Sequence, residues 1–148
     1  MPTSMKVEGM DHLLAKLDRI KMDTPRILRA EAKAGMVEFV QNPAKQKCAH
    51  DTGTLRREIH TEDLVDGVRT GTSLKYGIYV EFGTGLYAEN GKGRKTPWVF
   101  RYAGRKGKPG FRYTKGMRAQ PFLRPAWDEG KPKVLSRIKN GIGGVVRS

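Results

Sequence analysis

Residues 60–72 have the sequence HTEDLVDGVRTGT. The two halves of this segment, His60–Val65 and Val68–Thr72, have the composition of short strands, and Asp66-Gly67 separates them. An Asp-Gly pair between two such runs is a strong signal for a tight β-hairpin. The segment therefore predicts two antiparallel strands. Because helical patterns flank this hairpin on both sides, the whole chain is predicted to be α+β.

The residues before the hairpin have the apolar spacing of helices. Thr24 is expected to be an N-cap and Pro25 the first residue of a second helix, because the missing N–H of proline has no intrahelical partner there. Asn42-Pro43 is expected to end that helix, since a residue before proline is pushed out of the α region. The pattern predicts a helical hairpin over residues 9–41. The apolar face of its first helix comprises Met10, Leu13, Leu14, Leu17 and Ile20.

The residues after the first hairpin contain a second one. Tyr76–Phe82 fits both a strand and a helix, and periodicity over seven residues does not decide between them. The aromatic runs 98–102 and 111–114 predict two more strands, joined by a basic turn region. We therefore expect a small antiparallel sheet region over residues 51–117 that carries a long basic arm at residues 91–115.

The end of the chain predicts one more helix. Gln120-Pro121 is expected to begin it, with the proline in the first helical position, and the apolar stripe runs to residue 140. Gly130 and Pro132 are expected to break or kink this helix over residues 120–140. The glycine-rich tail, residues 141–148, is expected to fray.

The composition indicates one domain, residues 1–148, with a thin core. Val, Ile, Leu and Phe make up 31 of 148 residues, just above the level of roughly 20% below which highly charged chains tend to be disordered. No stretch approaches the roughly 18 consecutive apolar residues of a membrane span. The first 18 residues also lack the basic and then apolar pattern of a signal peptide. Cys48 is the single cysteine, so an internal disulfide is excluded and a reducing compartment is expected.

The charge is concentrated in the second half. The chain carries a formal charge of +14, of which residues 75–148 contribute +13. Between Gly91 and Arg118 there are ten basic residues and no acidic one, so this segment requires solvent or an anionic neighbour. Two interpretations stay open: contact with DNA or an acidic partner, and a structural hairpin with a solvated tip. The candidate contact residues are Lys92, Arg94, Lys95, Arg101, Arg105, Lys106, Lys108, Arg112 and Lys115.

Three short motifs resemble catalytic, metal or phosphate-binding sites, but their spacing or the residues around them do not fit such sites. Residues 51–53 have the tripeptide of the aspartic proteases, but polar and helical patterns flank it instead of buried strands. Cys48, His50 and His60 lack the second pair of ligands of a zinc site and are interpreted as ordinary surface residues of a connector. Residues 85–92 have the wrong spacing for a phosphate-binding loop. No catalytic residue, cofactor, metal or small-molecule substrate is therefore predicted.

Three segments in this order resemble one protein family. They are Asp51–Arg56, Tyr76–Gly85 and Lys115–Ala126, of which the second and third are the specific ones. With the N-terminal amphipathic helix before them, they resemble the tail-component or head–tail joining proteins of long-tailed double-stranded-DNA bacteriophages. The likeness extends over residues 9–138. The chain departs from the family pattern in its long basic loop and at Gly130-Lys131-Pro132.

The resemblance implies a structural protein without enzymatic activity. It implies a ring of identical subunits in the neck of the virion, made in the host cytoplasm and bound to neighbouring neck and tail proteins. No membrane contact is expected. The alternative function, from another class, is sequence-independent nucleic-acid binding through residues 91–118.

The same reasoning predicts an assembly interface. The aromatic residues of 76–82 and the start of the last helix are expected to pack together, either as plain core or against a neighbouring subunit. Glu81 is expected to pair with Arg118 or Arg124. The candidate interface residues are Tyr76, Tyr79, Glu81, Phe82, Arg118, Pro121, Phe122 and Arg124.

Overall fold

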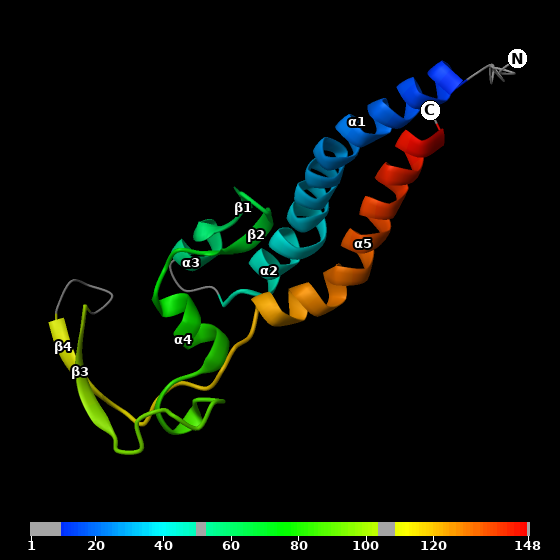
Figure 1. Ribbon diagram of the computed structural model, residues 1–148. Coiled ribbons are helices and arrows are strands. Elements are labelled where there is room, and N and C mark those ends of the chain that lie inside the picture. The colour runs from blue at the N-terminus through cyan, green and yellow to red at the C-terminus, as the bar shows by residue number, and fades with distance from the viewer. Residues whose placement is uncertain (1–9, 50–52, 104–108, 148) are drawn as a thin grey trace, which may run out of the picture.

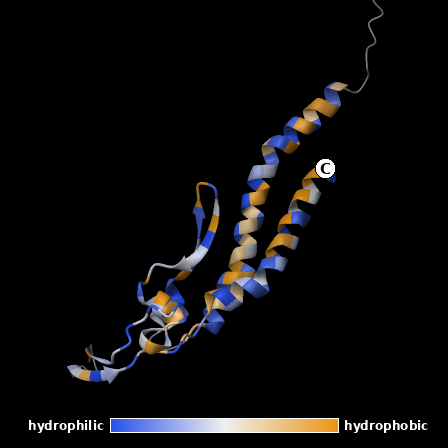
Figure 2. Ribbon diagram, turned by 60° about the horizontal axis from the view of Figure 1, so that its bottom comes forward, coloured by the Kyte–Doolittle hydropathy of each residue, from blue (hydrophilic) through white to orange (hydrophobic). Residues whose placement is uncertain are grey.

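The computed structural model describes residues 10–49, 53–103 and 109–147. Two long helices, α1 (Met10–Met36) and α5 (Leu123–Arg147), lie side by side and run in opposite directions (Figure 1). At the other end from the start of α1, a lobe of short helices and two β-hairpins extends from this pair (Figures 1 and 2). The predicted α+β class is confirmed.

The N-terminal segment is one helix, so the prediction of a helical hairpin over residues 9–41 is wrong. Helix α1 continues through Thr24 and Pro25. Thr24 does not cap a second helix, because its hydroxyl donates to the carbonyl of Ile20 within α1, at 2.6 Å. The contact between α1 and α5 is the most extensive one between any two elements of the described residues. This packing outweighs the cost of a proline inside the helix.

Asn42-Pro43 also fails to end the helical segment. After α1 the chain forms one π-helical stretch, η1 (Val37–Gln41), and continues as α2 (Asn42–Lys47). The amide of Asn42 donates to the carbonyl of Val37, five residues earlier. This wider turn shifts the hydrogen-bond register just before Pro43, which has no N–H to donate. The chain is therefore helical almost without interruption from residue 10 to residue 47.

Both predicted hairpins are present, but they form two separate two-stranded sheets. Strands β1 (Ile59–Leu64) and β2 (Gly67–Thr72) pair antiparallel, with Leu64 opposite Gly67. The turn is therefore Val65-Asp66 instead of Asp66-Gly67, and Gly67 does not use a positive φ. Strands β3 (Trp98–Ala103) and β4 (Pro109–Thr114) form the basic hairpin.

Short helices connect these hairpins to the rest of the chain. Helix α3 spans Thr54–Glu58 and follows Gly53, whose φ of 76° is left-handed. Asp51 and Thr52 of the protease-like tripeptide lie outside the described residues. The ambiguous segment is helical: α4 spans Tyr76–Phe82, and a 3-10 turn, η2, follows at Gly85–Tyr87.

The C-terminal helix is longer than predicted and begins later. It begins at Leu123, so Pro121 is not in the first helical position, and it continues without a break through Gly130 and Pro132. Figure 1 shows its first, orange turns at an angle to the rest, as expected for a proline kink. The predicted frayed tail is helical as far as Arg147, because Val145 is buried against α1.

The core is small and lies where α5, η1, α2, α3 and β1 meet. Phe122 and Ile59 are the largest fully buried side chains of the described residues. Cys48 belongs to this core, so its interpretation as a surface residue is wrong, and burial raises the pKa of its thiol. In contrast, Leu13, Leu14 and Leu17 of α1 are half exposed. The core cluster comprises Val40, Ala44, Cys48, Leu55, Ile59, Phe122, Ala126 and Val134.

Candidate assembly interface

Glu81 is a carboxylate buried in α4 that holds the beginning of α5. Its side chain is 5% exposed. It accepts backbone hydrogen bonds from Phe122 at 2.8 Å, Leu123 at 3.0 Å and Arg124 at 3.0 Å. The first N–H groups of a helix have no intrahelical acceptor, and a carboxylate there also suits the helix dipole. Glu81 is thus the cap of α5, supplied from 41 to 43 residues before the amides that it accepts from.

The charge of Glu81 is stabilised although its side chain is buried. Burial alone would raise the pKa of the carboxyl group. The three backbone amides and the guanidinium of Arg124 outweigh burial and lower the pKa of Glu81 below its ordinary value. Glu81 is therefore an anion at neutral pH, fully paired with the beginning of α5.

Arg124 is the arginine that pairs with Glu81, and this predicted contact is confirmed. Its Nε lies 3.0 Å from Oε1 of Glu81, and its Nη2 donates to the backbone carbonyl of Glu81 at 3.0 Å. Its Nη1 lies 2.8 Å from Oε2 of Glu89, and its guanidinium lies 4.7 Å from the centre of the Phe82 ring. Arg118 instead lies over the ring of Tyr87, at 5.3 Å.

The two most specific sequence segments, Tyr76–Gly85 and Lys115–Ala126, lie against each other around this cap. The amide of Gln120 donates to the carbonyl of Val80 at 2.8 Å, and the amide of Thr84 donates to the carbonyl of Met117 at 2.8 Å. A Cβ atom on Gly85 would lie 2.3 Å from the carbonyl oxygen of Lys115. The glycine therefore permits an approach of two backbones that no larger residue allows.

The remaining candidate interface residues do not form one cluster. Phe122 is fully buried in the core, whereas Pro121 is exposed. Tyr76, Tyr79 and Phe82 on α4 are each about half exposed. Phe122 therefore belongs to the core, and the role of the aromatic residues of α4 in an interface stays a prediction.

An open pocket beside α4 was missed by sequence reasoning. Its lining includes Tyr79 and Phe82 of α4, Trp98 of β3, and Lys92 and Arg94 from the loop between them; its volume is about 510 Å³. The guanidinium of Arg94 lies 5.7 Å from the centre of the Trp98 ring. We call this the aromatic pocket. Its residues come from α4, the first residue of β3 and the loop between them, so the pocket depends on how that loop folds.

The basic hairpin β3–β4 is uncovered on much of its surface. Val99, Phe111 and Tyr113, which share one face of the hairpin, are exposed, and Phe100 on the other face is 41% exposed. Arg112 lies over the Tyr102 ring at 4.7 Å. Six candidate contact residues lie in the described part: Lys92, Arg94, Lys95, Arg101, Arg112 and Lys115. Arg105, Lys106 and Lys108 lie outside the described residues.

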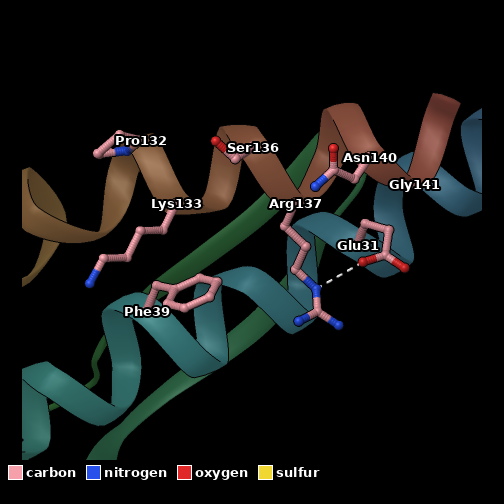
Figure 3. Close-up of a pocket in the computed structure, with 8 residues that line it drawn as sticks. All are labelled: Glu31, Phe39, Pro132, Lys133, Ser136, Arg137, Asn140 and Gly141. Carbon is pink, nitrogen blue, oxygen red and sulfur yellow. Dashed lines mark hydrogen bonds and ion pairs between the residues drawn. The ribbon is translucent and has the colours of Figure 1, made fainter.

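Residues that line the groove between α1 and α5 hold the helices together. Arg137 donates from Nε to Glu31 at 2.8 Å (Figure 3). It also donates from Nη1 to Glu38 at 2.8 Å. Lys133 lies over the ring of Phe39, at 5.9 Å. These contacts join α5 to α1 and to η1.

The described residues contain no group of three or more His, Cys, Asp or Glu side chains placed to hold a metal ion. Within residues 10–49, 53–103 and 109–147, no helix has the length and apolar character needed to cross a membrane.

The chain matches the model of a known phage protein family. The model of the HK97-gp10-like family, described as "Bacteriophage HK97-gp10, putative tail-component", matches residues 11–83, about half of the chain. No curated protein and no solved structure matches the chain significantly. The matched segment includes α1, the first hairpin and the whole of α4 with Glu81. Over these residues the chain belongs to the HK97-gp10-like family of bacteriophage tail components.

Proposed function

We propose that this chain is a non-enzymatic structural protein of the phage neck, a head–tail joining or tail-completion component that assembles as a ring. The family match over residues 11–83 carries the proposal, because it assigns the chain to phage tail components and hence to the virion. Residues 115–126 lie outside the family match and contact the matched part through Glu81 and Val80.

The distribution of apolar surface supports assembly. A core with two large fully buried side chains contributes little stability to a chain of this length. At the same time Leu14 and Leu17 of α1, Tyr79 of α4 and Phe111 of β4 present apolar surface to solvent. Association that covers such surface stabilises the folded chain. A head-to-tail contact between identical subunits closes into a ring when its rotation permits.

The basic hairpin supports a contact with an acidic neighbour in the neck. Arg101 and Lys115 are exposed in a segment that contains no acidic residue between residues 91 and 118. An acidic surface on an adjacent neck or tail protein would complement this charge. The alternative function, non-specific nucleic-acid binding, has no support from the comparisons.

Deleting the gene from the phage or prophage that encodes this chain should block the joining of heads and tails. Electron microscopy of the lysate is then expected to show separate capsids and tails, and the plaque titre should fall by several orders of magnitude. Joined particles should return when the wild-type chain is expressed in trans. A deletion that yields normal numbers of joined, infectious particles would contradict the proposed function.

A further inference from the structure

The tip of the β1–β2 hairpin carries an apolar residue that nothing covers. Val65 is 97% exposed, and Leu64 next to it is also exposed. Figure 2 shows this tip in the hydrophobic colour, at the end of a hairpin that stands away from the lobe. A valine whose whole side chain is in water is the type of residue that a partner covers.

The same tip is acidic. Glu62, Asp63 and Asp66 lie within four residues of one another beside Val65. Glu62 pairs with Arg69, and Asp63 pairs with Lys33 of α1. Asp66 is exposed and has no ion-pair partner among the described residues. An apolar side chain therefore sits next to a free carboxylate at the end of the hairpin.

The aromatic pocket has the complementary properties. Tyr79, Phe82 and Trp98 give it an apolar lining, and Lys92 and Arg94 contribute positive charge at exposed positions. Glu81 and Glu89 nearby are paired with Arg124. The pocket thus fits an apolar side chain that is accompanied by a carboxylate.

We propose that the β1–β2 tip of one copy of this chain docks into the aromatic pocket of the next copy, with Val65 in the pocket and Asp66 at Arg94 or Lys92. Within one copy this contact is not available. The tip lies beside the helix pair, where Arg29 of α1 donates to the carbonyl of Val65 at 2.7 Å. The loop that closes the pocket lies on the other side of α4 (Figure 1).

The two surfaces differ, so the contact is head-to-tail and each copy has one free tip and one free pocket. Repetition of such a contact gives a ring when the rotation closes. The inference rests on the proposed function for its biological setting, since it names the partner surface of the ring. The contact itself is tested in solution with the purified chain.

The test uses one variant for each surface. Val65→Lys alters the tip, and Arg94→Glu alters the pocket; both side chains are exposed, so both variants should fold. Val146→Lys, an equally drastic change at an exposed position of α5, is the matched control. Sedimentation velocity and native mass spectrometry measure the assembly of each protein alone and of a 1:1 mixture of the two variants.

We expect the wild type and Val146→Lys to form the same oligomer, and each surface variant alone to bind itself at least about tenfold more weakly. The mixture should form heterodimers, because the Arg94→Glu variant retains an intact tip and the Val65→Lys variant an intact pocket. A wild type that stays monomeric at all concentrations would overturn the inference. So would surface variants that assemble like the wild type, or a mixture that forms no heterodimer.

Failure of the proposed contact and failure of the proposed function give different experimental results. If Val65→Lys supports normal plaque formation although the gene is essential for joining, the contact is wrong and the function stands. If the heterodimer forms in solution but deletion of the gene leaves joined particles, the function is wrong and the contact stands.

Discussion

Replacing Glu81 by alanine should lower the free energy of unfolding by about 3–5 kcal/mol, the range observed when one partner of a buried, hydrogen-bonded ion pair is removed. The substitution leaves the amides of Phe122, Leu123 and Arg124 without their acceptor at the beginning of α5. It also removes one of the two carboxylates that hold Arg124. Urea denaturation followed by circular dichroism measures this loss.

Glu89→Ala is the matched control for this prediction. Glu89 pairs with the same arginine, but its side chain is 42% exposed and it caps no helix. Exposed ion pairs contribute about 0–1 kcal/mol, so this variant should be close to the wild type. If the two substitutions had equal effects, Glu81 would be one ordinary ion pair and not the cap of α5.

Gly130→Ala should destabilise the protein by about 1–3 kcal/mol, the usual cost of overpacking a core. In an open helix the same change is favourable by roughly 1 kcal/mol, because alanine loses less backbone freedom than glycine on folding. Here a Cβ atom would lie 2.3 Å from the carbonyl oxygen of Phe39 and 3.0 Å from Cγ2 of Val40. The helix α5 would have to move away from η1. Thermal denaturation measures the change.

Gly143→Ala gives the control in the same helix. A Cβ atom on Gly143 has no heavy atom within 4 Å, so the change should stabilise by up to about 1 kcal/mol. The two substitutions are chemically identical and are predicted to have opposite signs. A stabilised Gly130→Ala variant would mean that α5 does not approach η1 as closely as the structure places it.

Features of the fold that depend on local patterns could be predicted from the sequence. The Asp66-Gly67 pair between two strand-like runs correctly indicated the first hairpin, although the turn itself is shifted by one residue. The pairing of Glu81 with an arginine near the start of the last helix was also predicted, and Arg124 is that arginine. The hairpin is visible as a local motif, whereas the Glu81–Arg124 contact joins residues 43 positions apart and followed from the two segments that carry the family resemblance.

Features that depend on tertiary packing could not be predicted. Pro25 and Pro132 are both signals of a helix boundary, yet both lie inside the two long helices that pack against each other. The aromatic pocket could not be predicted for the same reason. Trp98 and Tyr79 line one pocket only because the chain turns at Gly83 and Gly85. The energy of such contacts is set by residues far away in the sequence.

The central claim is that this chain is a structural part of the neck of a phage. Its most direct test is electron microscopy of purified virions labelled with gold-conjugated antibody against the chain. We predict label at the junction of head and tail. Virions without label on any of their parts, prepared from a lysate that contains the protein, would contradict the claim.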